Sequence, residues 1–260
     1  MAGRWREVVL VGTLAAAAVG VFSLPALPQD PAYHVMADRR TLLGIPHALN
    51  VLSNLPFAVT GGLGLAAVAA ARRRLRSFRA DAWRAAAYGA LFGGVALTAF
   101  GSSYYHLAPD NARLIWDRLP MTVGFMGLLA AMLDERVRRG LARVALVPLL
   151  IVGAFSVAWW GYTESRGAGD LRLYGLVQFG SLALVILLLI LYPDREPDAP
   201  PGTRGYVVAA LVLYAVAKVF EALDTQVFAL GGIVSGHTLK HLAAAAGLVP
   251  LAMMIRSRIT

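Results

Sequence analysis

Five polar residues in three separated segments have the types and spacing of a hydrolytic metal site. Ser102 and His106 are four residues apart, Asp117 follows further along the chain, and His237 and His241 are again four apart. Residues four apart share one helix face, so two histidines at this spacing can bind one zinc ion. A third histidine leaves one tetrahedral position open, as in catalytic zinc sites. The sequence therefore predicts Zn²⁺ bound by His106, His237 and His241.

The serine and the carboxylate near the first histidine each have two interpretations. Ser102 could donate a hydrogen bond to an oxyanion, or it could be a small residue that eases helix packing. Its neighbour Ser103 is rotated about 100° away on a helix. Asp117 could act on a water molecule at the metal, or it could pair with Arg113 or Arg118. We favour catalytic roles for Ser102 and Asp117.

A second group of charges lies further along the chain. Lys218 and Glu221 are three residues apart and can neutralise each other on a helix, with Asp224 on the same arc. Lys240 could pair with Glu221 or Asp224. We expect this group to hold helices together; a charge relay in a transporter is the alternative. The polar residues Asn50, Ser53 and Asn54 are expected to form hydrogen bonds between helices.

These residues must be positioned by membrane helices, because the composition excludes other classes of protein. Of the 260 residues, 58% are hydrophobic and 15% are charged, whereas soluble domains average about 45–50% and about 25%. The absence of cysteine excludes disulfides, thiolate metal sites and a cysteine nucleophile. The net charge of +9 comes mostly from arginines between apolar segments. We therefore expect no nucleic-acid partner, and a lipid bilayer around the protein.

The apolar runs predict an all-α polytopic membrane helix bundle with a seven-helix core and one additional N-terminal span. A span needs about 20 mainly apolar residues. Residues 1–30 would form a membrane anchor or uncleaved signal helix, with a cleaved signal peptide as the alternative, and residues 31–260 the seven-span domain. The predicted spans are Val8–Leu24, His47–Ala70, Ala85–Leu107, Leu114–Leu133, Val144–Trp160, Leu171–Tyr192, Tyr206–Phe228 and His237–Ile255.

Arginine asymmetry predicts the orientation of these spans. Loops on the cytoplasmic side carry the excess of Lys and Arg. Sixteen arginines fall on the side of the two termini, and the opposite side receives Arg39, Arg40, Arg113, Arg118, Arg166 and Arg172. Both termini are therefore expected in the cytoplasm, with the site near the external face. In a bacterium the membrane would be the inner membrane.

The polar pattern resembles the alkaline ceramidase family. The matching residues are Ser102-x-x-x-His106, Asp117 and His237-x-x-x-His241, and Asn50-x-x-Ser53-Asn54-Leu55 is similar to the family's first core span. The resemblance covers roughly residues 38–255. That family belongs to a superfamily of seven-span membrane hydrolases, which also includes adiponectin-receptor-like proteins.

The resemblance implies a zinc-dependent hydrolase that cleaves a ceramide-like lipid amide to a sphingoid base and a fatty acid. It implies that three histidines hold zinc, that Asp117 orients and deprotonates water, and that Ser102 stabilises the oxyanion. Calcium binding is doubtful, because the region before the first core span has only Asp30 and Asp38 as acidic residues, and His47 stands where the family has a glutamate. The alternatives are a zinc hydrolase of another lipid amide or ester, and a non-enzymatic seven-span receptor or sensor with structural zinc.

Overall fold

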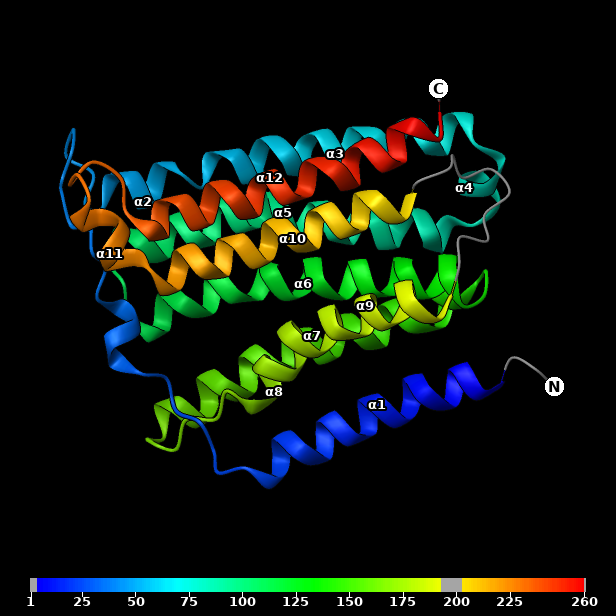
Figure 1. The fold of residues 1–260 in the computed structure, drawn as a ribbon, viewed down its shortest axis with the longest axis horizontal. Coiled ribbons are helices and arrows are strands. Elements are labelled where there is room, and N and C mark those ends of the chain that lie inside the picture. Colours follow the sequence, from blue (N-terminus) through cyan, green and yellow to red (C-terminus); the bar gives the residue numbers. More distant parts are fainter. Residues whose placement is uncertain (1–3, 193–202, 260) are drawn as a thin grey trace.

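The protein is an all-α polytopic helix bundle, as predicted. The computed structural model describes residues 4–192 and 203–259. Among these residues, eight helices are long and apolar enough to cross a membrane. They alternate in direction, so both termini lie at one end of the bundle (Figure 1). Arg195, one of the sixteen arginines assigned to that end, lies outside the described residues.

The helices agree with the predicted spans in number and differ in detail at their ends. Polar caps fix several starts: the side chains of Asp81 and Asp110 accept hydrogen bonds from backbone N–H groups at the first turns of α5 and α6. The helices are α1 (Arg4–Ser23), α2 (Ala48–Leu52), α3 (Leu55–Arg74), α4 (Arg76–Ala80), α5 (Ala82–Leu107), α6 (Asn111–Arg136), α7 (Leu141–Ser165), α8 (Arg172–Gly175), α9 (Ser181–Leu191), α10 (Thr203–Ala222), α11 (Asp224–Ala229) and α12 (Gly236–Ser257). A 3₁₀ turn, η1 (Pro31–His34), precedes α2.

Two predicted spans contain features that hydrophobicity does not reveal. The seventh was predicted to run to Phe228, but α10 ends at Ala222 and the separate helix α11 begins at Asp224. Asp224 therefore lies outside that span, contrary to the prediction. The sixth span includes a π-helical turn, η2 (Leu176–Gly180), between α8 and α9. Such turns are frequent at functional sites.

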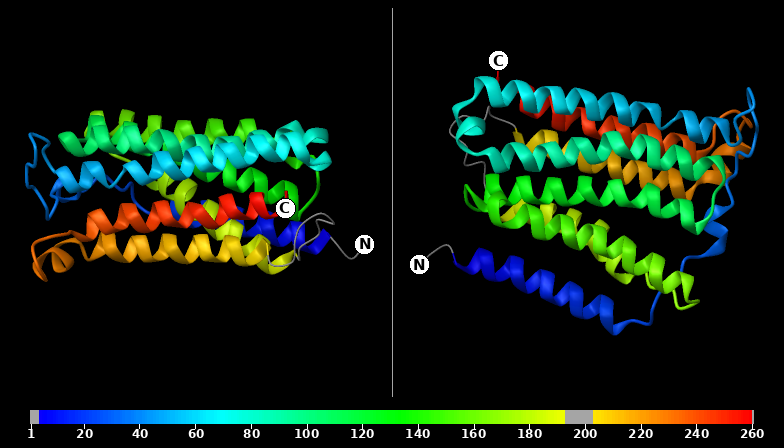
Figure 2. Two further views of the ribbon diagram at one scale, coloured as in Figure 1. Left: turned by 90° about the horizontal axis from the view of Figure 1, so that it is seen from above. Right: turned by 180° about the vertical axis from the view of Figure 1, so that it is seen from behind.

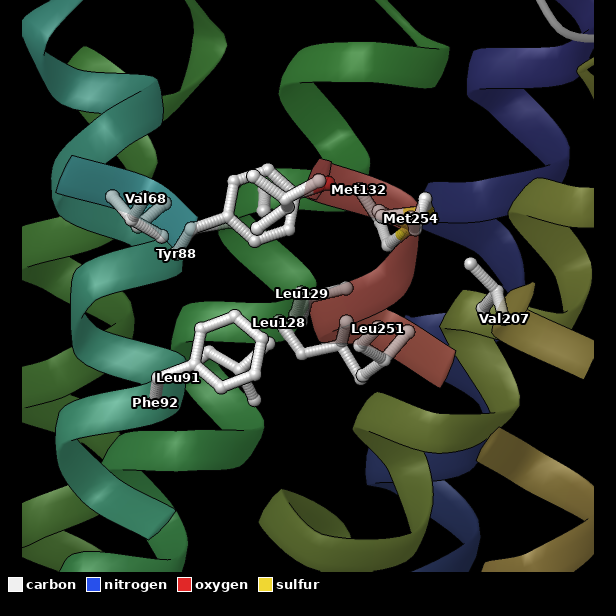
Figure 3. Close-up of a cluster of buried hydrophobic side chains, with 14 of the residues drawn as sticks. Val68, Tyr88, Leu91, Phe92, Leu128, Leu129, Met132, Val207, Leu251 and Met254 are labelled. Carbon is white, nitrogen blue, oxygen red and sulfur yellow. The ribbon is translucent and has the colours of Figure 1, made fainter. Parts of the chain in front are cut away.

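The core lies between α3, α5, α6, α7, α9 and α12, and α10 adds Val207. Figure 3 shows Leu91 and Phe92 of α5, Leu128 and Leu129 of α6, and Leu251 of α12 converging on one buried cluster. Figure 2 shows α1 at the edge of the bundle, where it packs mainly against α9 and η2. Its only buried residue is Leu10. The arrangement is a seven-helix core with one peripheral N-terminal helix.

Candidate metal centre

Three histidines meet at the end of the bundle opposite the termini. His106 lies in the last turn of α5, while His237 and His241 lie in the first turns of α12. Their ligand atoms all lie within 4.8 Å of one another, and all three residues are buried. The Nε2 atoms of His106 and His237 are 3.2 Å apart. Two nitrogens bound at about 2.0–2.1 Å to one tetrahedral ion would be separated by about 3.3–3.4 Å, so this spacing suits a shared metal ion.

The start of α12 places two of these histidines. Ser235 is the N-cap, and its side chain accepts a hydrogen bond from the backbone N–H of Thr238. The backbone N–H of His237 donates to the Asp224 carboxylate at 2.7 Å. A Cβ atom at Gly236 would lie 2.2 Å from the Phe220 carbonyl oxygen, so only glycine permits this approach of α12 to α10. The break after α10 thus anchors the histidine-bearing turn.

The ring of His241 is oriented by a serine from another helical segment. The Ser53 hydroxyl donates to the Asn50 carbonyl and lies 2.8 Å from His241 Nδ1. Because that hydroxyl proton is already used, Nδ1–H is the donor to Ser53 and Nε2 is left unprotonated. The Asn50 side chain accepts a hydrogen bond from Thr238 at 2.8 Å. The predicted hydrogen bonds between helices are therefore present for Asn50 and Ser53, whereas the Asn54 amide bonds within its own helical segment.

The donor set fits a borderline metal ion. It consists of three imidazoles, which must be neutral to bind a metal. The Nδ1 atom of His106 is buried and has no hydrogen-bond partner among the described residues. The nitrogen of this ring that lies next to His237 is Nε2, so Nδ1 is not the atom that would bind the shared ion. The group can hold a metal ion.

Ser102 and Asp117 are brought together by a close approach of α5 and α6. A Cβ atom at Gly101 would lie only 2.0 Å from the Trp116 carbonyl oxygen. The two helices therefore touch beside Ser102 and Asp117, and these two side chains interact. Both residues are buried and line the cavity that His241 also lines. Ser103 points away, because its hydroxyl donates to the Val51 carbonyl.

Asp117 does not form the ion pair that was its alternative interpretation. Arg113 instead pairs with Asp110 at 2.7 Å. Arg118 donates to the side-chain oxygen of Gln29 at 2.6 Å. The Asp117 carboxylate is thus left facing the cavity without an arginine partner within the described part of the chain.

One cavity of about 400 Å³ runs from the polar end into the core. Its polar end is lined by Ser102, Asp117, His241 and Arg118, and by Gln29 and Tyr33 from the segment before α2. Its inner part is apolar, with lining residues that include Leu91, Val95, Leu128, Leu211, Leu248 and Leu251, several of which appear in Figure 3. The turn η2 contributes Gln178 and Phe179 to one wall. An amphiphile with one chain fits this distribution of polarity.

The charged residues Lys218 and Glu221 of α10 form a partly exposed cluster with Lys240 of α12. Glu221 bonds Lys218 on one oxygen and Lys240 on the other, the latter at 3.3 Å. Lys240 therefore pairs with Glu221, one of its two predicted partners. Asp224 is not part of this cluster, because it accepts the backbone N–H groups of His237 and Ala37. The cluster links α10 with α12, as expected for charges that hold helices together.

The sequence reasoning missed the residues at the outer wall of the cavity. Arg118 was considered as a partner of Asp117 and in the arginine count but not as a lining residue, and Gln29 and Tyr33 were not considered. The position of the segment around η1 depends on contacts such as the hydrogen bond from Tyr33 to Glu221, which no sequence spacing indicates. The one available signal was the arginine itself, since charges inside a membrane span mark functional sites.

Fold and site define a multi-pass membrane protein with a buried three-histidine group that can hold a metal ion. Comparison with known proteins found no matching family model, no similar curated protein and no similar solved structure. Membership of the ceramidase family therefore stays a prediction from the polar pattern. The function has to be argued from the site.

Proposed function

We propose that the protein is a zinc-dependent membrane amidase that hydrolyses the amide bond of a lipid. The observation that carries the proposal is that Ser102, Asp117 and His241 line one apolar cavity, with His106 and His237 beside His241. A metal centre, a carboxylate and a hydroxyl at the polar end of a cavity with an apolar interior suit hydrolysis of an amphiphile. The resemblance to alkaline ceramidases points to a ceramide-like substrate.

Zinc is the ion that best suits these ligands. Imidazole nitrogen is a common zinc donor, and three protein ligands leave a position for water or substrate. When bound, zinc would lower the pKa of a water molecule toward about 7 and polarise the substrate carbonyl. His106, His237 and His241 would hold it.

The chain's own residues would manage the proton and the developing charge. Asp117 would accept the proton of the attacking water and transfer it to the leaving nitrogen. One C–O bond forms and the C–N bond breaks, so the products are a fatty acid and an amine. Ser102 would donate a hydrogen bond to the oxyanion of the tetrahedral intermediate. The apolar surroundings would strengthen both interactions by lowering the local dielectric.

We further propose that this site faces the exterior and that both termini are cytoplasmic. The arginines at the end of the bundle that carries the termini outnumber those at the histidine end, which supports this orientation. A lipid substrate could then reach the cavity from the outer leaflet of the bilayer. Nucleic acid has no role in this proposal.

Metal analysis and lipid hydrolysis on the purified protein test the function together. We expect one zinc per chain and release of fatty acid from an amide lipid, with both lost in His241→Ala. Ser53→Ala should keep the site but weaken zinc binding about 10- to 100-fold, because it removes the partner of the ligand's second nitrogen. Full-rate hydrolysis by zinc-free His241→Ala protein would refute the proposal. Stoichiometric zinc without hydrolysis of any amide or ester lipid would favour a receptor or sensor instead.

A further inference from the structure

We infer that Arg118 binds the carboxylate of a single-chain amphiphile in the cavity. This inference depends on the proposed function in one respect. The proposed amide hydrolysis is the reason for naming the amphiphile as an acidic lipid amide, an N-acyl amino acid. It departs from the ceramide-like substrate that the family resemblance implies, because ceramide has no anionic group. The binding site itself is defined by contacts that do not involve the histidines.

Arg118 is buried, yet its guanidinium is incompletely partnered. The residue is 6% exposed and lines the cavity. Its Nη2 atom donates to Gln29 at 2.6 Å, whereas Nη1 is buried and has no hydrogen-bond partner among the described residues. A buried charge is costly unless it is paired. An anion that bonds Nη1 would satisfy both the hydrogen-bond donor and the charge.

Aromatic rings hold the guanidinium in place without neutralising it. The Cζ atom of Arg118 lies 4.3 Å from the ring centroid of Trp160, 4.7 Å from that of Tyr174 and 5.7 Å from that of Tyr33. Stacking against aromatic faces leaves the edge of the guanidinium available, and that edge matches the two oxygens of a carboxylate. The side chain is therefore oriented in advance for a planar anion.

The other cations that line the cavity already have a carboxylate partner. Lys218 and Lys240 both pair with Glu221. Arg118, by contrast, forms no ion pair within the described part of the chain. The polar end of the cavity thus has three cations, Arg118, Lys218 and Lys240, against two carboxylates, Asp117 and Glu221. A ligand with one negative charge would balance this set.

The position of Arg118 suits the head group of an amide lipid. It follows Asp117 on α6, so the two side chains leave the helix at nearly the same depth but in different directions. Asp117 adjoins Ser102 of α5, whereas Arg118 reaches toward α7 and α8. If the amide bond of such a ligand lies beside Asp117, a carboxylate close to that amide lies on the Arg118 side. The acyl chain then occupies the apolar part of the cavity. A free fatty acid offers the same carboxylate without the amide.

Binding measurements with ligands that cannot be hydrolysed test this inference. The probes are the ketone analogues of N-oleoylglycine and N-oleoylethanolamine, in which CH₂ replaces the amide nitrogen, together with oleate. They share one chain and differ in the head group. Affinities are measured by ligand-induced thermal shift and by displacement of a fluorescent fatty acid from the full-length protein in nanodiscs.

We expect the wild-type protein to bind the acidic ketone at least about tenfold more tightly than the neutral one, as a charge-assisted hydrogen bond provides. Arg118→Gln should abolish this preference. Arg113→Gln is the matched control, since that arginine lies on the same helix but pairs with Asp110, and it should keep the preference.

Equal affinity of the wild-type protein for the two ketones would overturn the inference, and this comparison needs no variant to fold. An unchanged preference in a folded Arg118→Gln protein would overturn it as well. If oleate binds more tightly than the acidic ketone, and Arg118→Gln weakens oleate binding, the carboxylate is that of a fatty acid. Failure of all amide hydrolysis would refute the proposed function and leave these rankings unaffected.

Discussion

Ser102 and Ser103 are adjacent in sequence but have different surroundings. The hydroxyl of Ser102 adjoins Asp117 in the cavity, while that of Ser103 donates to the Val51 carbonyl. If Ser102 stabilises an oxyanion, Ser102→Ala should lower kcat about 10²- to 10³-fold, the usual cost of losing such a donor. Steady-state release of fatty acid measures the effect.

The neighbouring serine provides the matched control for this experiment. Ser103→Ala should leave kcat within a factor of two to three of wild type, since it removes one hydrogen bond outside the cavity. Zinc content should be unchanged in both variants, because Ser102 interacts with Asp117 and Ser103 bonds the Val51 carbonyl, so neither belongs to the three-histidine group. Equal activity of the two variants would show that Ser102 only eases helix packing.

At the scale of single residues, the sequence predicted the cluster but not the details around it. His106, His237 and His241 could be placed at one depth because span direction and position along a helix fix depth. The partners of Arg118 could not be predicted, since Gln29 and Tyr33 lie in an irregular segment whose path depends on long-range contacts. The hydrogen bond from His241 to Ser53 likewise required the relative rotation of two helices.

The contact between α5 and α6 determines how closely the side chains of Ser102 and Asp117 approach each other. Gly101→Ala would place a Cβ atom 2.0 Å from the Trp116 carbonyl oxygen, so the two helices must separate. Such overpacking typically costs about 1–3 kcal/mol. We expect a lower melting temperature in detergent and a reduced rate of hydrolysis.

Another glycine of the same helix serves as the comparison. No atom lies within 4 Å of the position that a Cβ would occupy at Gly93. Gly93→Ala should keep or raise the melting temperature, because alanine is the better helix former. Equal destabilisation by the two substitutions would contradict the assigned role of Gly101. By contrast, a Cβ atom at Gly94 would lie 2.5 Å from the Gly124 nitrogen, so this glycine permits close packing of α5 against α6.

The loop between α7 and α8 carries an ion pair that connects to α1. Arg172 bonds Asp170 at 2.8 Å and also donates to the Leu24 carbonyl. Hydrogen bonds from Arg172 lower the pKa of the Asp170 carboxyl to about 2. Because the folded-state pKa lies below the unfolded value of about 3.9, this stabilisation is present above pH 4 and is lost as the pH falls toward 2.

The melting temperature of Asp170→Asn should therefore lie below that of wild type at pH 7. The difference between the two proteins should shrink as the pH falls from 4 toward 2. Melting curves over this pH range give the comparison. A difference that stays constant down to pH 2 would mean that the ion pair does not contribute.

At the scale of elements, apolar run length predicted eight spans but not their interruptions. The turn η2 occurs inside a run that is largely apolar, and α10 ends at Ala222 between the charged residues Glu221 and Asp224. Hydrophobicity reports only that a segment can lie in lipid, and helix breaks arise from contacts with neighbouring elements. The break before Asp224 frees that carboxylate to accept a hydrogen bond from the backbone N–H of His237, in the histidine-bearing turn.

In the whole molecule, α1 begins and α12 ends at one end of the bundle (Figure 1), and the histidines lie at the other end, in the last turn of α5 and the first turns of α12. The absence of cysteine permits single-cysteine labelling on an otherwise inert chain. Ala168→Cys lies at the histidine end and Ala82→Cys at the terminal end, both at exposed positions. In intact cells a membrane-impermeant maleimide should label the cysteine at 168, whereas the cysteine at 82 should react only after permeabilisation. The reverse pattern would place the site on the cytoplasmic side.

The segment between α1 and α2 forms the outer wall of the cavity, and its attachment at several points lowers the entropy that it loses on docking there. Arg172 fixes its start at Leu24, the hydrogen bond of Tyr33 to Glu221 fixes its middle, and Ala37 is bound to Asp224. A segment anchored at both ends by membrane helices has a high effective concentration at its docking place and loses little entropy on docking. A few hydrogen bonds are therefore enough to hold it there, and the peripheral helix α1 acts as a tether for the outer wall of the cavity.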